Sequence, residues 1–160
     1  MALVMFFGDP TCILKIHGRP LRIPLSHMLP VYLKEFQFYD RLPKRISEYI
    51  HSKKEKLINI DVGANIGDTI SALSFNNSDV FLAIEPYPKF YELLVQNWGS
   101  NKNVMLSNDI CSNKSGEFEN IMIEQGGTAS ISSSPNRTLK YARTLDDIIK
   151  DYPEISTSIC

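Results

Sequence analysis

Short apolar runs alternate with helical patterns in the part of the chain that follows Lys56. The apolar runs cover residues 57–61, 80–85 and 103–106, and the helical patterns cover residues 68–75 and 88–98. Continuous apolar runs of this length are typical of parallel strands that are buried on both faces. A β-α-β-α-β order joins such strands by right-handed crossovers and places helices on the faces of the sheet. The sequence therefore predicts an α/β fold with an open, mostly parallel sheet.

The first 53 residues follow a different pattern. Two short extended runs, residues 12–16 and 21–23, flank a turn-like His-Gly-Arg-Pro segment, which predicts a hairpin. Pro43 suits the first turn of a helix that we expect to end near Ser52. The residues expected on its inner face are Ile46, Tyr49 and Ile50. We therefore divide the chain into a hairpin and helical extension, residues 1–53, and an α/β part, residues 54–160.

Further signals refine the α/β part. The helix over residues 88–98 has apolar residues at steps of three and four, namely Tyr91, Leu94, Val95 and Trp98. An extra strand is predicted over residues 117–124, and the polar residues 126–136 are interpreted as a loop. Residues 144–147 have the T-x-x-D form of a helix start, so a last helix is predicted there.

Charge and cysteine content exclude several functional classes. The chain has 17 basic and 18 acidic residues and a net charge of −1, without a dense basic block, so nucleic acid is not an expected partner. The cysteines are scattered, which excludes a disulfide framework and a zinc knuckle and suits a reducing cytosol; they are Cys12, Cys111 and Cys160. No apolar run is long enough to cross a membrane. We expect a cytoplasmic chain without a metal site or a membrane span.

The candidate site combines one turn with the ends of two predicted strands. In the segment DVGANIG, Asp61 ends the first strand, Gly63 allows a sharp turn beside a ligand, and Gly67 opens a helix and permits close packing against the strand. Glu85 ends the second strand 24 positions after Asp61 and is followed by Pro86. An acidic residue at that place can accept both hydroxyls of a ribose, so the pattern predicts an adenosine-containing ligand.

The details of the turn favour one ligand of this kind. A dinucleotide fingerprint has the form G-x-G-x-x-G, but Asn65 and Asp68 stand where its second and third glycines belong. A carboxylate at Asp68, with Asp61 nearby, opposes a pyrophosphate. S-adenosylmethionine has no phosphate; its ammonium and sulfonium groups suit nearby acids, and its carboxylate suits free N–H groups at the helix start. The charge of the turn therefore favours S-adenosylmethionine over a nicotinamide dinucleotide.

Each residue also has a simpler interpretation. Glu85 can cap the helix that follows it, and Asp61 can form a strand-end turn. Asp109, after the third strand, can contact an adenine or cap a loop. The three histidines lie in the N-terminal part without a carboxylate pattern and are interpreted as ordinary surface or hairpin residues; they are His17, His27 and His51.

The chain resembles the FkbM-type methyltransferases over nearly its whole length. The similar stretches are LPVYLKEFQFYDRL, INIDVGANIGDT, AIEPYPKFYELL, SNDICSNKSGEF and RTLDDII. The resemblance implies a Rossmann-like class I methyltransferase fold, S-adenosylmethionine as methyl donor, and a hydroxyl acceptor on a sugar, other glycan or secondary metabolite. By this likeness the first cofactor motif is Asp61, Gly63, Ala64, Asn65 and Gly67, the ribose motif is Glu85 with Pro86, and the adenine-side segment is Asp109 with Ile110, where the usual alanine is absent.

The last residues depart from that family. Its T-L-D-D segment leads into a strand resembling K-I-D-x-E-G, whereas this chain continues to DYPEISTSIC. We therefore expect a sheet that is incomplete at its C-terminal side and a catalytic group that the sequence does not identify. The first strand, which is expected to be apolar on both faces, is then left as a sheet edge. Such a chain is expected to be poorly stable or to pair with a second copy through that edge, and to show no methyl transfer. Two alternatives remain: a non-catalytic remnant that binds adenosine ligands or a partner protein, and a nicotinamide-dependent oxidoreductase.

Overall fold

The computed structural model describes residues 8–125, 127–132 and 138–159. Its N-terminal elements are β1, Thr11–Ile16, β2, Arg19–Pro24, α2, Leu29–Glu35, and α3, Arg41–Ser52. β1 and β2 pair antiparallel, with Leu14 opposite Leu21, so the predicted hairpin is confirmed. The predicted helix is also confirmed, and it begins two residues before Pro43.

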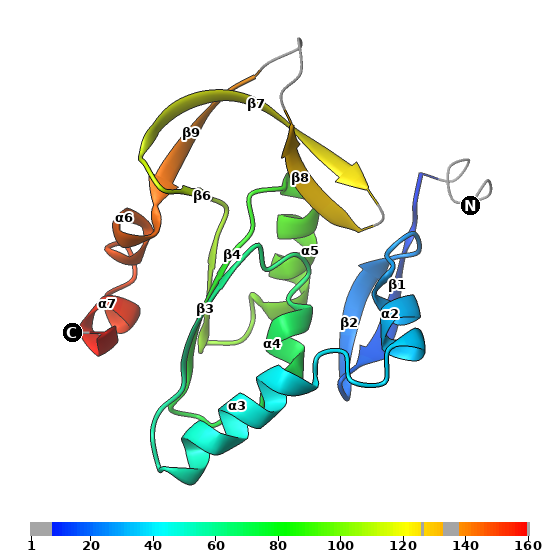
Figure 1. Cartoon of the computed structure of the whole chain (residues 1–160), viewed down its shortest axis with the longest axis vertical. Coiled ribbons are helices and arrows are strands. Elements are labelled where there is room, and N and C mark those ends of the chain that lie inside the picture. Colours follow the sequence, from blue (N-terminus) through cyan, green and yellow to red (C-terminus); the bar gives the residue numbers. More distant parts are fainter. Residues whose placement is uncertain (1–7, 126, 133–137, 160) are drawn as a thin grey trace.

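A three-stranded parallel sheet lies at the centre of the molecule (Figure 1). Its strands are β3, Ile58–Val62, β4, Val80–Ile84, and β5, Val104–Ser107, and the helices between them are α4, Asp68–Ala72, and α5, Pro88–Trp98. β4 is the middle strand. The alternating strand and helix pattern of the sequence therefore gave the correct elements here, and this region has mixed α/β architecture.

The main core joins the sheet to the helices and the hairpin. Phe81 of β4 stacks on Phe75 with ring centroids 4.5 Å apart, and Phe75 lies 5.7 Å from Trp98 of α5. Ile23 of β2 is fully buried in the same cluster. Because burying a large apolar side chain stabilises a fold by about 1.5–3 kcal/mol, this shared core fixes the hairpin against α4 and α5. Figure 1 shows these two helices between the sheet and the hairpin.

A second sheet has a mixed topology that the sequence did not predict. Its strands are β6, Ile110–Ser112, β7, Gly116–Gln125, β8, Thr128–Ser132, and β9, Thr138–Thr144. Their order is β6-β9-β7-β8; β6 and β9 are parallel and the other pairs antiparallel. The predicted parallel sheet is confirmed for β3, β4 and β5, whereas the later strands form this separate, mixed sheet. The prediction of a loop over residues 126–136 is wrong for residues 128–132, which form a strand, and residues 126 and 133–136 lie outside the described residues. Thr128, Ser130 and Ser132 are polar, but backbone pairing with β7 places this segment in the sheet.

Two short helices cover the other face of the central sheet. They are α6, Leu145–Ile149, and α7, Pro153–Ile159. The predicted start of α6 is confirmed, because the Thr144 hydroxyl accepts a hydrogen bond from the Asp147 N–H at 3.2 Å. α7 was not predicted from sequence. Its Ile155 is fully buried with Leu82 and Ile84 of β4, which explains why this polar-looking segment is helical.

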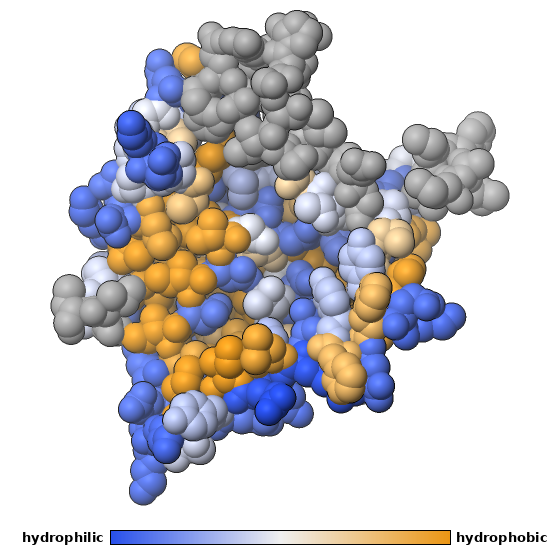
Figure 2. Space-filling view, in the orientation of Figure 1, coloured by the Kyte–Doolittle hydropathy of each residue, from blue (hydrophilic) through white to orange (hydrophobic). Residues whose placement is uncertain are grey.

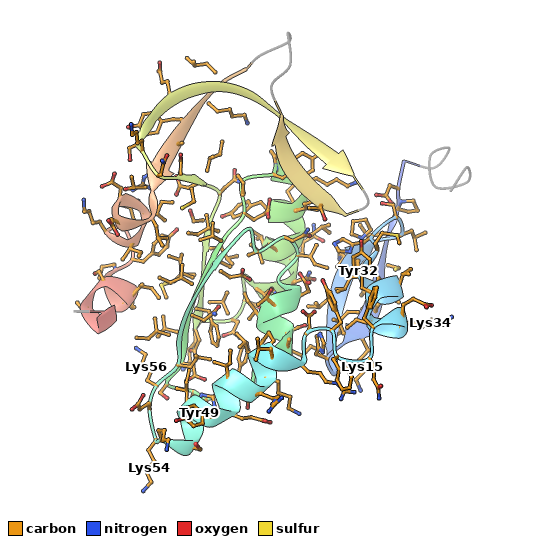
Figure 3. The ribbon with its side chains drawn as sticks, viewed as in Figure 1. Lys15, Tyr32, Lys34, Tyr49, Lys54 and Lys56 are labelled. Atoms are coloured by element: carbon orange, nitrogen blue, oxygen red, sulfur yellow. The ribbon has the colours of Figure 1, made fainter. Side chains whose placement is uncertain are left out.

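Two predicted helix faces need correction. In α3, Tyr49, which is labelled in Figure 3, is 63% exposed. Ile46 is 47% exposed, and Ser47 is the buried residue. The Ser47 hydroxyl accepts from the Ser74 N–H at 2.9 Å, so a small polar residue lets α3 approach the end of α4. In α5, Val95 is 42% exposed. The apolar periodicity gave the wrong inner face for α3 because the close approach of α3 to the end of α4 requires a small side chain at the contact.

A buried carboxylate fixes the segment before β3 to the segment before β4. Asp79 accepts hydrogen bonds from the Leu57 N–H at 2.9 Å and the Asn76 N–H at 2.6 Å, and its Oδ2 lies 3.0 Å from His51 Nε2. His17 similarly lies 3.5 Å from Asp40. The interpretation of the histidines as residues without carboxylate partners is therefore wrong for His17 and His51. The pairs join residues 23 and 28 positions apart, a separation that no local pattern reveals.

β3 is an edge of the central sheet, as predicted, among the strands that the structure describes. The prediction that it is apolar on both faces is wrong. Ile58 and Ile60 pack beside α6 and α7, but Asn59 Oδ1 and Asp61 Oδ2 are buried on the other face. Figure 2 shows apolar side chains gathered over this region, beside α6 and α7. Val62 at the strand end is 52% exposed.

Pairing of two copies through the β3 edge stays a prediction. Val62→Lys places a charge on that edge, and such charges block strand pairing. We expect sedimentation to show an associated species for the parent chain and a shift toward monomer for Val62→Lys. Val95→Lys adds the same charge on exposed α5 and is expected to leave the association unchanged. A parent chain that sediments as a monomer at all concentrations would contradict the prediction.

Candidate functional site

The glycine turn between β3 and α4 is held onto the end of β4. The N–H groups of Gly63 and Ala64 both donate to the Ile84 carbonyl, at 2.8 and 3.0 Å. The Asn65 N–H donates to Glu85 Oε2 at 2.8 Å. Gly63 has a φ of +85°, so the predicted sharp turn is present and uses the left-handed backbone that glycine permits; a close approach to a ligand stays a prediction. A Cβ at Gly63 would meet no atom within 4 Å, so the turn presents an open backbone surface.

Glu85 links the turn to the start of α5. Its second oxygen, Oε1, accepts from the Tyr87 N–H at 2.8 Å, and Tyr87 is the N-cap of α5. The residue is 4% exposed, and this burial raises the pKa of its carboxyl, although the two N–H donors partly oppose the shift. The simpler interpretation of Glu85, a helix-start cap, is therefore one role that it has. A contact with ribose hydroxyls stays a prediction.

Two further acids lie at the turn. Burial raises the pKa of Asp61. Burial, with smaller contributions from Asp40 and Asp61, raises the pKa of Asp68 to about 6. Asp61 Oδ2 is buried without a hydrogen-bond partner. Since an unsatisfied buried oxygen costs about 1–3 kcal/mol, the site favours a donor or cation at this atom.

Gly67 allows a close helix approach, but its neighbour differs from the prediction. Its φ is +84°, and a Cβ there would overlap the indole Nε1 and Cδ1 of Trp98 on α5. The same indole N–H donates to the Gly67 carbonyl at 3.1 Å. The predicted packing against the strand is therefore replaced by packing against α5, because α5 crosses over the turn.

The expectation of free N–H groups at the start of α4 is wrong for four residues of the turn. Gly63, Ala64 and Asn65 donate to Ile84 and Glu85, and the Gly67 N–H donates to the Ala64 carbonyl at 2.8 Å. These four groups therefore bond within the protein.

Asn65 connects the turn to two segments that the sequence did not assign to the site. Its Oδ1 lies 3.3 Å from His27 Nε2, and its Nδ2 donates to the Gly127 carbonyl at 2.6 Å. His27 Nδ1 accepts from the Leu29 N–H at 3.2 Å, so its proton lies on Nε2 and is donated to Asn65. The tip of the β7–β8 hairpin is thereby held over the glycine turn. The only sequence signal was the asparagine that replaces the second glycine of a dinucleotide motif.

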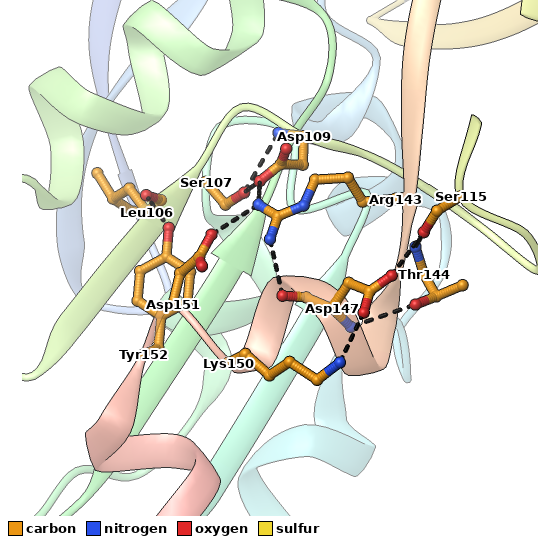
Figure 4. Close-up of polar contacts among 10 residues, drawn as sticks. All are labelled: Leu106, Ser107, Asp109, Ser115, Arg143, Thr144, Asp147, Lys150, Asp151 and Tyr152. Atoms are coloured by element: carbon orange, nitrogen blue, oxygen red, sulfur yellow. Dashed lines mark hydrogen bonds and ion pairs between the residues drawn. The ribbon is translucent and has the colours of Figure 1, made fainter. Parts of the chain in front are cut away.

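Asp109 caps a loop and joins the two sheets (Figure 4). Its Oδ2 accepts from the Ser107 hydroxyl at 2.6 Å and lies 3.3 Å from Arg143 Nη1 of β9. Arg143 also pairs with Asp151 at 2.7 Å. The structure therefore supports the interpretation of Asp109 as a loop cap. Adenine contact stays a prediction.

The remaining predicted site residues have different environments. Ala64 is 1% exposed inside the main core, and Ile110 is 7% exposed at the start of β6. Pro86 is half-buried between β4 and α5. The structure thus brings together the turn residues and Glu85, whereas Asp109 and Ile110 lie at the junction of the two sheets.

Comparison with known proteins gives little further information. No family profile matches the chain, and no curated protein matches it. A solved structure of a proposed transferase, PH0793, from Pyrococcus horikoshii is similar at a TM-score of 0.45 and 18% identity. The similarity covers 62% of this chain, which spans 36% of that one. In the described residues, no helix is long and apolar enough to cross a membrane.

Proposed function

We propose that this chain binds S-adenosylmethionine at the glycine turn and belongs to a methyltransferase that acts on a hydroxyl group of a sugar or secondary metabolite. The single observation that carries the proposal is Asp61 Oδ2, a buried carboxylate oxygen without a hydrogen-bond partner beside the open turn. An ammonium group is the ligand part that satisfies such an oxygen. Asp68 and Glu85 place two more acids at the same turn.

The fit differs between the parts of the ligand. The acids suit a cationic ligand and oppose a pyrophosphate, which supports S-adenosylmethionine over a nicotinamide dinucleotide. The N–H groups of Gly63, Ala64, Asn65 and Gly67 bond within the protein, so these four do not suit the ligand's carboxylate. When bound, S-adenosylmethionine supplies an electrophilic methyl group. The proposed cytoplasmic location rests on the scattered cysteines.

Calorimetry tests the proposal directly. We expect S-adenosylmethionine and S-adenosylhomocysteine to bind with one site per chain and NAD to show no heat of binding. Binding of NAD alone would support the oxidoreductase instead. A screen of hydroxyl acceptors that detects released S-adenosylhomocysteine then separates a methyltransferase from a protein that only binds adenosine ligands.

Glu85→Ala tests the ribose contact. We expect the variant to weaken S-adenosylhomocysteine binding by about 1.5–3 kcal/mol, the range for hydrogen bonds to a charged group. Glu85 also holds the turn, so weaker binding alone would not show a contact with the ribose. The 2′-deoxy analogue of S-adenosylhomocysteine lacks one ribose hydroxyl. The parent chain should bind S-adenosylhomocysteine more tightly than this analogue, and Glu85→Ala should bind both equally. Glu92→Ala, which removes an exposed acid of α5, is the control. Equal weakening of both ligands would assign Glu85 to the turn alone.

The raised pKa of Asp68 predicts a pH dependence of binding. A carboxyl with a pKa of about 6 is mostly neutral at pH 5 and mostly ionised at pH 7. A cationic ligand binds the ionised form better, so the affinity for S-adenosylmethionine should rise about tenfold over this interval. The contribution of Asp68 to the free energy of unfolding has the opposite trend: it is present at low pH and lost as the pH rises through about 6. Asp68→Asn should show a smaller rise than the parent chain, because Asp61 and Glu85 remain at the site. A flat profile in the parent chain would contradict the prediction.

A further inference from the structure

A separate cavity lies between the hairpin, α3 and the end of α4. Its volume is about 540 Å³, within the range of about 300–1,000 Å³ that is usual for small-molecule sites. One side is formed by residues 71–74. The ionisable residues on its other sides are His17, Arg19, Asp40, Arg41, Lys44, Arg45 and Glu48. None of the predicted residues of the glycine turn lines this cavity.

Three arginines line the cavity. Among the described residues, no carboxylate forms an ion pair with Arg19, Arg41 or Arg45. The guanidinium of Arg19 lies 4.1 Å from the ring centroid of Phe75, and that of Arg41 lies 5.0 Å from the ring centroid of Phe38. Stacking on a ring holds the plane of a guanidinium and leaves its edge N–H groups able to donate. Two arginines held in this way, together with Arg45 in the same cavity, favour an anion.

The two acids of the cavity, Asp40 and Glu48, are outnumbered by its three arginines and Lys44. Asp40 is the N-cap of α3; its Oδ2 lies 3.5 Å from His17 Nε2 and is buried without a hydrogen-bond partner. Glu48 lies 3.7 Å from Lys44, with both side chains more than half exposed, so this contact is weak.

We propose that this cavity binds an organic phosphate, with Arg19, Arg41 and Arg45 holding the phosphate group. Guanidinium groups match phosphate oxygens in pairs, which makes arginine the usual side chain for this recognition. The cavity is much larger than one phosphate ion, so the ligand carries an organic part. The site is independent of the glycine turn and of any methyl transfer.

Binding of glucose 6-phosphate to the full chain tests the proposal, with glucose and inorganic phosphate as comparison ligands. We expect saturable binding of glucose 6-phosphate, weaker binding of inorganic phosphate, and none of glucose. Arg45→Gln and Arg41→Gln should each weaken the binding about tenfold. Lys34→Gln removes the same charge from exposed α2, outside the cavity, and should change nothing (Figure 3).

Other results would overturn the proposal. If glucose 6-phosphate shows no saturable binding, the cavity is not a phosphate site. If the Lys34 and Arg45 variants lose the same affinity, the binding reflects general charge attraction. If inorganic phosphate binds as tightly as glucose 6-phosphate, the cavity does not recognise the organic part of the ligand. S-adenosylhomocysteine affinity is measured in the same variants and should not change, so this site and the glycine turn are judged separately.

Discussion

Gly67→Ala is expected to lower the free energy of unfolding by about 2–5 kcal/mol. The left-handed backbone at this position costs alanine about 1–2 kcal/mol, and forcing a methyl group into a packed core costs about 1–3 kcal/mol more. The new Cβ would overlap the Trp98 indole ring. That ring is 4% exposed and its N–H bonds to the Gly67 carbonyl, so it has little room to move. Urea denaturation of both proteins measures the difference.

Gly63→Ala is the matched control for this prediction. Gly63 has nearly the same φ, +85° against +84°, but its Cβ would meet no atom within 4 Å. It should therefore cost only the backbone term, about 1–2 kcal/mol. The difference between the two variants isolates the contact with Trp98. Equal costs would show that α5 moves away freely and that Gly67 is needed for its backbone alone.

Asp79→Ala is expected to destabilise the chain by about 2–6 kcal/mol, since each of the two N–H groups left unsatisfied costs about 1–3 kcal/mol. The substitution leaves the Leu57 and Asn76 N–H groups without their acceptor and removes the partner of His51. The Asp79 side chain is fully buried, so water cannot replace it without a rearrangement. The free energy of unfolding in urea is the measurement, and it should fall without a change in cofactor binding.

Two further variants separate the contributions. His51→Gln removes the contact between the imidazole and Asp79 and keeps both backbone hydrogen bonds of Asp79, so it should cost less than Asp79→Ala. Glu55→Ala removes an exposed acid from the same segment and should change stability by less than about 0.5 kcal/mol. If Asp79→Ala were as mild as Glu55→Ala, the hydrogen bonds of Asp79 would not fix the two segments.

The local sequence pattern predicted the glycine turn but not the residues that pack around it. The strand, the glycine turn and the start of the helix lie within about ten residues, so a sharp turn at Gly63 and close packing at Gly67 could be predicted directly. His27 and Gly127 could not, because they contact Asn65 across 38 and 62 positions. A contact of that length depends on how the hairpin and the second sheet pack, which no short window contains.

The sequence by itself determined the elements whose signal is local: the β1–β2 hairpin, the β3-α4-β4-α5-β5 order, and the Thr144 start of α6. Periodicity and capping express interactions between residues at most a few positions apart, so they can be read along the chain. The tertiary structure alone decided the mixed second sheet, the burial of α7 on β4, and the pairing of His51 with Asp79. These features form because segments distant in the chain must satisfy each other's hydrogen bonds and cover each other's apolar surface.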